Sequence, residues 1–233
     1  MKEQFTEIIK SKDLHDITID LVEKVLDNEI TNEVLKEIPV LKSLVAVKNI
    51  YTSYTDKIFI KKTMNVLLEL GDLDVDEKDE LLAELDETDE SGIEKILMAV
   101  DRLETIKKCK VYGRLCKLKA KGEILVWDFL RLTKLIQDAY LDDLALITDF
   151  KKGDKKEIWE ENYVAIIALG LLFQEPSEQM PIERNYQYDD GDPEFKGGEI
   201  KFYYRLSDVG ETLLTHYHYL FPEELKKTDI SDL

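Results

Sequence analysis

The sequence predicts a mainly α-helical protein, in which a helical bundle of residues 1–150 precedes a small α+β unit of residues 151–233. Through the bundle, apolar residues recur every three or four positions, which is the spacing of one helix face. The run at 199–206 instead alternates as a strand does, and residues 151–153, Lys-Lys-Gly, separate the two patterns. With 44% hydrophobic and 35% charged residues, the composition is typical of a folded globular chain.

The bundle is expected to begin with helices at residues 3–27 and 31–38. The second of these should end where it does because the residue before Pro39 is forced out of the helical region. Pro39 can then open a third helix, since its missing N–H costs nothing at the first helical position. That helix is predicted over residues 40–70, with Gly71 as its C-cap.

Two segments of opposite charge follow. Residues 72–90 hold eleven acids and one lysine, whereas residues 102–121 hold eight bases and one acid. Five bases of the second segment are spaced by three and four residues, which places them in one stripe along a helix. This basic stripe comprises Lys107, Lys110, Arg114, Lys117 and Lys121. Either the two segments are solvated or neutralise each other within the fold, or the basic stripe binds an acidic partner or a phosphate backbone.

Two further helices complete the predicted bundle. Gly122 separates the basic helix from a helix at 124–137, and a last helix is expected over 140–150. The core side of the first of these is predicted to carry the apolar residues Ile124, Trp127, Leu130, Leu135 and Ile136.

The C-terminal unit is expected to contain a helix closed by Gly170, a strand entered at 171–173 and a polar loop at 174–198. In the second strand, alternate residues should share one face: Ile200, Phe202, Tyr204 and Leu206. Asp208, with Glu211 three residues later, forms a capping-box pattern that predicts a final helix through Leu220.

This order of elements, with the segments 169–171 and 204–210 around a long hairpin, resembles the closing half of a winged-helix domain of bacterial regulators. The likeness covers residues 169–214. The whole chain also resembles an uncharacterised class of bacterial helical proteins, through an Ile-Pro-Val entry at 38–40 and a Gly-Glu-Ile turn at 122–124. The resemblance implies a winged-helix-like unit and no activity.

The charges depart from those of a DNA-reading winged helix. Acids occupy the expected recognition helix, at Glu157, Glu160 and Glu161, and crowd the hairpin loop at 189–194. The whole chain has 32 bases against 50 acids, a net charge of −18. Nucleic-acid binding is therefore disfavoured, because it depends on basic side chains that displace counterions from phosphates.

The sequence contains few residue patterns that could form a catalytic or metal-binding site. Cys109 and Cys116 lie about two helical turns, roughly 10.8 Å, apart, which excludes an intrahelical disulfide and favours a reducing compartment. The acids at 72–76 imitate the start of a calcium loop, but its sixth and twelfth positions are Glu77 and Ala83. The three histidines form no chelating or catalytic pair. We predict no catalytic residue, no metal site and no cofactor.

These features predict a non-enzymatic, cytoplasmic protein that acts through a protein partner bound at the basic stripe. Two alternatives stay open. In the first, the apolar helix at Pro39–Tyr54, interrupted by Lys42 and Lys48, leaves the bundle and perturbs a membrane, as in a bacterial defence or toxic effector. In the second, the acidic surface mimics DNA and inhibits a nucleic-acid enzyme.

Overall fold

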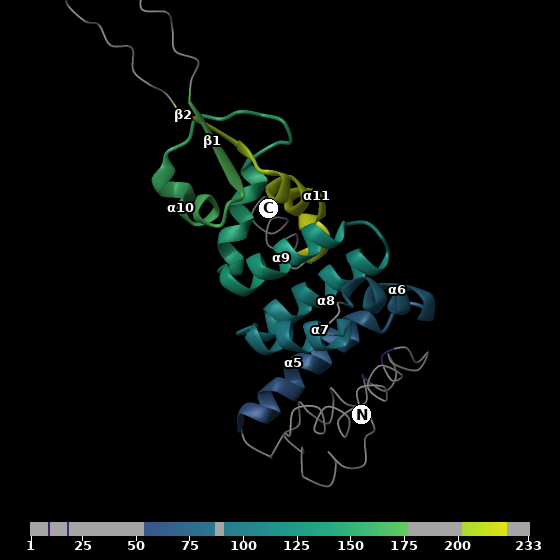
Figure 1. Ribbon diagram of the computed structural model, residues 1–233. Coiled ribbons are helices and arrows are strands. Elements are labelled where there is room, and N and C mark those ends of the chain that lie inside the picture. Colours follow the sequence, from purple (N-terminus) through teal and green to yellow (C-terminus); the bar gives the residue numbers. More distant parts are fainter. Residues whose placement is uncertain (1–8, 10–17, 19–53, 87–90, 177–201, 223–233) are drawn as a thin grey trace, which may run out of the picture. The chain divides into compact units, whose positions relative to one another are not determined.

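A computed structural model describes Ile9, Thr18 and residues 54–86, 91–176 and 202–222 (Figure 1). The described residues form seven α-helices, one 3₁₀ helix and a sheet of two strands, so the mainly helical class is confirmed. They divide into two compact units. The first contains the described residues up to Leu141 and those from Thr215 onward, and the second is Asp142–Leu214.

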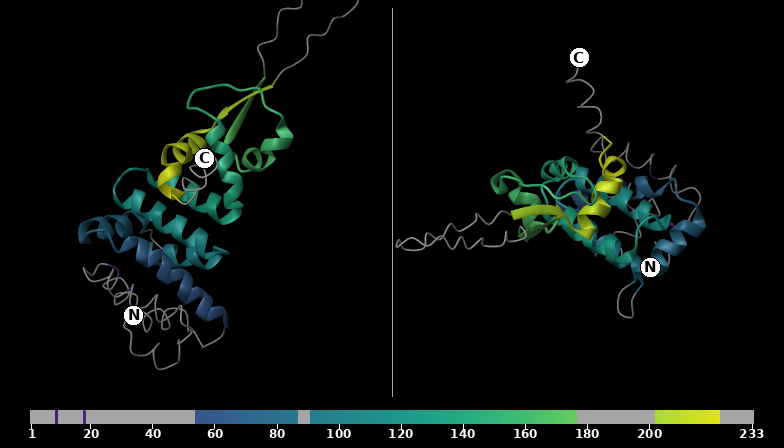
Figure 2. Two further views of the ribbon diagram at one scale, coloured as in Figure 1. Left: turned by 180° about the vertical axis from the view of Figure 1, so that it is seen from behind. Right: turned by 90° about the horizontal axis from the view of Figure 1, so that it is seen from above.

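The first unit is a helical bundle. Its helices are α5 (Tyr54–Leu70), α6 (Val75–Leu85), α7 (Gly92–Arg102), α8 (Ile106–Ala120), α9 (Val126–Asp138) and the last turns of α11 (Asp208–Leu220). Helix α8 is central to the bundle, because it packs against α5, α6 and α9. Figure 2 shows these helices side by side from two further directions. Of the predicted helices before residue 54, only Ile9 and Thr18 are described, and both are helical and buried; the Pro39–Tyr54 segment up to residue 53 lies outside the described residues.

Side-chain caps fix where three of these helices begin. Asp74 accepts the N–H of Glu77 at 2.8 Å, and the Glu77 carboxylate accepts the N–H of Asp74 at 2.9 Å. Ser91 and Glu94 form the same reciprocal pair at the start of α7, and Thr105 caps α8. Each cap stabilises its helix by about 1 kcal/mol. Asp74, one of the acids that imitate a calcium loop, therefore serves as the N-cap of α6.

The core of the bundle forms around the inner face of α8. Its buried apolar residues are Cys109, Val111, Tyr112, Leu115, Cys116 and Leu118. Helix α5 buries Ile60, Met64 and Leu67, and α9 buries Phe129, Leu132, Leu135 and Ile136. The Tyr112 and Phe129 rings are in contact, with centroids 6.1 Å apart. Full burial of a side chain of this size contributes roughly 1.5–3 kcal/mol, so this face accounts for much of the stability of the unit.

The second unit places a small sheet beside short helices. Its elements are the 3₁₀ helix η1 (Leu141–Asp149), α10 (Glu160–Ala168), β1 (Leu172–Pro176), β2 (Phe202–Leu206) and the first turns of α11. The strands are antiparallel, with Leu172 opposite Leu206. Lys156 bridges to Tyr204 by two backbone hydrogen bonds of 2.9 Å, on the other edge of β2. Gly170 closes α10 with a φ of +71°, which confirms the predicted stop and explains the glycine.

Two predicted core residues of α9 are wrong. Trp127 is 70% exposed and Leu130 is 38% exposed. The buried face of α9 instead centres on Phe129, Leu132 and Ile136. A helix turns by 100° per residue, so a row of residues spaced by three drifts around the axis and leaves the face that α8 covers.

Three other elements also differ from the predictions, one in its type of helix and two in where they begin or end. Residues 141–149 form a 3₁₀ helix rather than an α-helix, and β1 continues to Pro176, inside the predicted loop. Helix α11 ends at Leu220 as predicted, but its N-cap is Ser207, whose hydroxyl accepts the N–H of Gly210 at 3.1 Å. The Ser207 hydroxyl also donates to the carbonyl of Gly170 at 2.7 Å, which ties the helix start to the turn before β1.

Candidate functional site

The basic stripe lies on α8 and just beyond it. Lys107, Lys110, Arg114 and Lys117 are all half-buried, whereas Lys121, at the C-cap, is exposed. Thr105 sets the helical register by capping the first turn, with its hydroxyl 3.2 Å from the N–H of Lys108. The structure therefore brings four of the five predicted residues onto one helix, and their neighbours differ along its length.

The C-terminal half of the basic stripe is paired with α5 and the turn after it. Arg114 Nε lies 3.4 Å from Glu69 Oε1, and Lys117 Nζ lies 2.8 Å from Asp72 Oδ2 and 3.9 Å from Glu69 Oε2. The side chains of Glu69, Arg114 and Lys117 are each at most 20% exposed. These ion pairs hold α8 against α5, so the acidic and basic segments partly neutralise each other within the fold, as one of the two interpretations expected.

A glycine allows this close approach of the two helices. A Cβ atom added at Gly113 would lie 2.6 Å from Glu69 Cβ and 3.3 Å from the carbonyl oxygen of Val66. Any larger side chain would push α5 away from α8. Gly113 therefore brings the Glu69 carboxylate within reach of both Arg114 and Lys117.

Arg114 also contacts the end of α11. One of its terminal nitrogens donates to the carbonyl oxygen of Leu220 at 2.9 Å. The last carbonyls of a helix have no partner within the helix and carry partial negative charge. The guanidinium satisfies one of them and places Leu220 and Phe221 beside α8.

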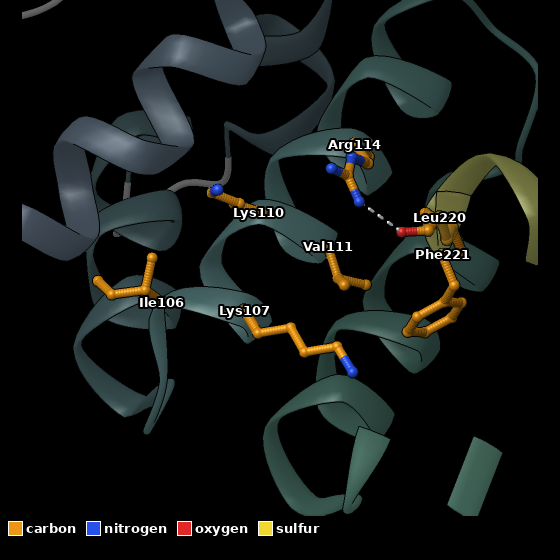
Figure 3. Close-up of a pocket in the computed structure, with 7 residues that line it drawn as sticks. All are labelled: Ile106, Lys107, Lys110, Val111, Arg114, Leu220 and Phe221. Carbon is orange, nitrogen blue, oxygen red and sulfur yellow. Dashed lines mark hydrogen bonds between the residues drawn. The ribbon is translucent and has the colours of Figure 1, made fainter. Parts of the chain in front are cut away.

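The N-terminal half of the basic stripe lines a small pocket (Figure 3). The pocket has a volume of about 130 Å³. Its lining residues are Ile106, Lys107, Lys110, Val111, Arg114, Leu220 and Phe221. In Figure 3 the Lys107 side chain extends past Val111 toward the Phe221 ring, while Lys110 lies on the side of Ile106. Three bases thus surround an apolar surface.

Lys110 differs from the other bases of the pocket. Among the residues that the structure describes, its side chain makes no hydrogen bond or ion pair, whereas Arg114 contacts Glu69 and Leu220. Lys107 takes part in further interactions of its own. Lys110 is therefore the base of the pocket with an ammonium group available to a ligand.

Two other lysines of α8 belong to the core. Lys108 donates to the carbonyl oxygen of Gln137 at 2.8 Å and pairs with Glu104 at 3.2 Å, and Lys119 pairs with Glu84. Both lysines are about 4% exposed. The sequence contains the signal for this burial, since positions 108 and 119 fall on the same helical face as Tyr112 and the other core residues.

The thiols on α8 are unsuited to nucleophilic chemistry. Cys109 and Cys116 are both free and buried. Burial disfavours the charged thiolate and raises the pKa of each to about 12. Burial likewise raises the pKa of Tyr112, whose side chain is hydrogen-bonded to that of Cys116. Protonated thiols are poor nucleophiles and poor metal ligands.

The carboxylates and histidines of the described residues form no group of three that could hold a metal ion. Of the acids at the calcium-like run, Asp72 binds Lys117 and Asp74 caps α6. His15 and the acidic loop at 189–194 lie outside the described residues.

Comparison of the chain with protein-family models, with curated proteins and with solved structures finds no match. None of the described helices combines the length and the apolarity that are needed to cross a bilayer. The sequence did not identify the apolar part of the pocket. Leu220 contacts a residue 106 positions away, a separation for which local periodicity carries no signal.

Proposed function

We propose that this chain is a non-enzymatic, cytoplasmic protein that works by binding a partner protein, and that the pocket beside α8 is its docking point. The observation that carries the proposal is the combination of three bases with an apolar surface in one preformed hollow. The buried, free thiols of Cys109 and Cys116 support a reducing compartment.

The size of the pocket favours a protein partner over a small-molecule substrate. Pockets for cofactors and drug-sized ligands usually measure roughly 300–1,000 Å³. At about 130 Å³, this pocket suits a single anchoring side chain of a larger partner. Protein interfaces commonly concentrate their binding energy in such anchors, so a small pocket is sufficient for specific binding.

A phosphate backbone fits the same site less well. Nucleic-acid binding requires an array of available bases along the surface, but Arg114 and Lys117 are already paired with Glu69 and Asp72. The apolar lining of the pocket offers nothing to a phosphate. The net charge of −18 adds a long-range repulsion.

We further propose that the second unit is winged-helix-like and that the chain belongs with the uncharacterised bacterial helical proteins that it resembles. The antiparallel pair β1 and β2, the bridge from Lys156 to the far edge of β2, and the start of α11 directly after β2 support this fold. Acids on α10, at Glu160 and Glu161, favour a structural or protein-docking use over DNA reading.

A comparison of charge variants tests the proposed function. Wild-type protein, Lys110→Glu and the control Lys134→Glu would each be immobilised and exposed to a lysate of the source cells. Lys134 is a suitable control because it is an exposed lysine of the same unit, on α9. We expect a partner protein to be retained by the wild type and the control and lost with Lys110→Glu. Equal retention by all three forms, or turnover of a substrate by the pure protein, would contradict the proposal.

A further inference from the structure

We infer that the start of α10 binds a basic segment of a protein partner, in which an arginine side chain stacks on the Trp159 ring and pairs with the carboxylates of Glu160 and Glu161. Trp159, Glu160 and Glu161 together form the α10 surface. This surface goes beyond the proposed function, because the pocket beside α8 belongs to the first unit and α10 to the second.

Trp159 gives the local structure little stabilisation. It is the N-cap of α10, yet its side chain makes no capping hydrogen bond to the described backbone of the helix. Serine, threonine, aspartate or asparagine at an N-cap stabilises a helix by about 1 kcal/mol, and tryptophan forgoes this gain. Its ring does not belong to the core either, because Trp159 is 78% exposed. An exposed tryptophan that breaks a local rule without a gain in packing indicates a binding role.

Two carboxylates follow Trp159 directly on the helix. Glu160 and Glu161 occupy the first turn of α10, and both are exposed. The Tyr204 hydroxyl donates to Glu160 Oε1, and the side-chain amide of Gln174 lies 3.4 Å from the same oxygen. These neutral donors leave the charge of Glu160 in place and hold its carboxylate in one position. A charged group that is already fixed loses less conformational freedom when a ligand binds.

The charge at this helix start favours a cationic ligand. The N-terminus of a helix carries roughly half a positive charge, and the carboxylates of Glu160 and Glu161 outweigh it about fourfold. The net charge of −18 adds a long-range attraction for a basic segment. A basic partner is therefore both attracted to the chain and matched by the α10 surface.

The two lysines that precede α10 contact other groups. Lys155 Nζ pairs with Glu175, and Lys156 Nζ lies 5.4 Å from the centre of the Phe150 ring. Each of these ammonium groups thus has a described partner other than the carboxylates of the α10 surface.

Arginine matches both components of the α10 surface. Its planar guanidinium can stack on a tryptophan ring, which attracts cations more strongly than other aromatic rings do, and its N–H groups can pair with carboxylates. Lysine offers a compact, strongly hydrated charge instead. Phe202 is 44% exposed and lies on the same face of β2 as Tyr204, about 7 Å along the strand. It offers an apolar contact to a neighbouring residue of the segment.

A fluorescein-labelled octapeptide of alternating arginine and glycine tests this inference on the purified full chain. Fluorescence anisotropy should show saturable binding to the wild type. Trp159→Ala should weaken this binding at least about fivefold. The matched control is Trp127→Ala, since Trp127 is 70% exposed and lies on α9 in the first unit. The control should bind within about twofold of the wild type.

Two double variants separate the local contact from the overall charge. Glu160→Gln/Glu161→Gln removes two negative charges from the α10 surface. Asp76→Asn/Glu80→Gln removes the same charge from exposed positions of α6, in the first unit. We expect the first variant to bind the peptide about tenfold more weakly than the second. An octapeptide of alternating lysine and glycine should bind the wild type at least about threefold more weakly than the arginine peptide.

The fluorescence of the two tryptophans of the chain reports the contact directly. Trp127→Phe leaves Trp159 as the remaining tryptophan, and its emission should change along the same binding curve as the anisotropy. In Trp159→Phe, the emission of Trp127 should stay constant as the peptide is added. Circular dichroism verifies that each variant keeps its helices.

Four results would overturn the inference: no saturable binding to the wild type, equal affinities of Trp159→Ala and Trp127→Ala, equal affinities of the two double variants, or a peptide-induced change in the emission of Trp127 and not of Trp159. Binding of the lysine peptide as tight as that of the arginine peptide would overturn the assignment of arginine.

Discussion

The two halves of α8 carry bases at the same spacing and use them differently. In the C-terminal half, Arg114 and Lys117 share Glu69 and hold α8 against α5. In the N-terminal half, Lys107 and Lys110 line a pocket. The basic stripe is one pattern in the sequence, but its C-terminal half has the acids Glu69 and Asp72 as partners. Periodicity thus predicts where charges lie on a helix, while the neighbouring helix decides what they do.

The inner face of α8 shows no such division. Cys109 lies in the N-terminal half and Cys116 in the C-terminal half, and both are buried with a pKa of about 12. The difference between the halves is therefore confined to the outer face.

The largest effect is expected in the reactivity of the two thiols. A pKa of about 12 in place of 9.0 lowers the thiolate fraction at pH 8 about thousandfold, and burial also blocks the reagent. Each cysteine, left alone by replacing the other with Ala, should therefore react with a disulfide reagent at least about a thousandfold more slowly than in denatured protein. Much faster reaction of Cys109 than of Cys116 would show that the N-terminal half opens and that the pocket is not preformed.

The same pKa values imply a loss of stability in alkali. Below pH 9 the thiols are protonated in both the folded and the unfolded chain, so they contribute no pH dependence. Between about pH 9 and 12 only the unfolded chain releases these protons, because the folded pKa is raised. Unfolding should therefore become easier as the pH rises through this range. Urea titrations of wild type and of a Cys109→Ala/Cys116→Ala variant at pH 8 and 10 measure the difference.

The next largest effect concerns the close approach of α8 to α5. Gly113→Val should lower the free energy of unfolding by about 3 kcal/mol, because the new side chain would overlap Glu69 Cβ and the backbone of Val66. Lys110→Val is the comparison on the N-terminal half, where we expect a change of at most about 0.5 kcal/mol. Urea denaturation provides both values. A loss below about 1 kcal/mol for Gly113→Val would mean that the two helices can separate freely.

A smaller effect is expected from the shared carboxylate. Within the described part of the chain, Glu69→Gln leaves Arg114 with no carboxylate partner and Lys117 with Asp72 alone; the two cationic side chains are 16% and 12% exposed. Loss of a partly buried charge partner should lower the free energy of unfolding by about 1–3 kcal/mol. In an Arg114→Met background the same change should cost less, since one of the two cations is already gone. A double-mutant cycle measures this coupling, and additive effects would show that Glu69 and Arg114 do not stabilise each other.

The sequence could predict some features of this fold and not others. The α8 helix, its end before Gly122 and the stop of α10 at Gly170 follow from periodicity and from glycines with φ of +68° and +71°. The buried face of α9 differs from the prediction, because residues 124, 127 and 130 form an equally regular row, whereas the helices that pack on α9 cover the row that contains Phe129. The pocket depends on Phe221, which no local pattern connects with α8.

The smallest effect on stability is expected at Lys110. This effect tests most directly whether the two halves of α8 differ. Its side chain makes no hydrogen bond or ion pair among the described residues, so Lys110→Gln should change the free energy of unfolding by at most about 0.5 kcal/mol. Lys117→Gln, about two turns further along the same stripe, breaks the pair with Asp72 and should cost about 1 kcal/mol. Thermal and urea unfolding of the two variants side by side measure the difference. Equal losses would show that both halves of the basic stripe serve the fold, and a base that stabilises the fold in this way is not available to hold a partner.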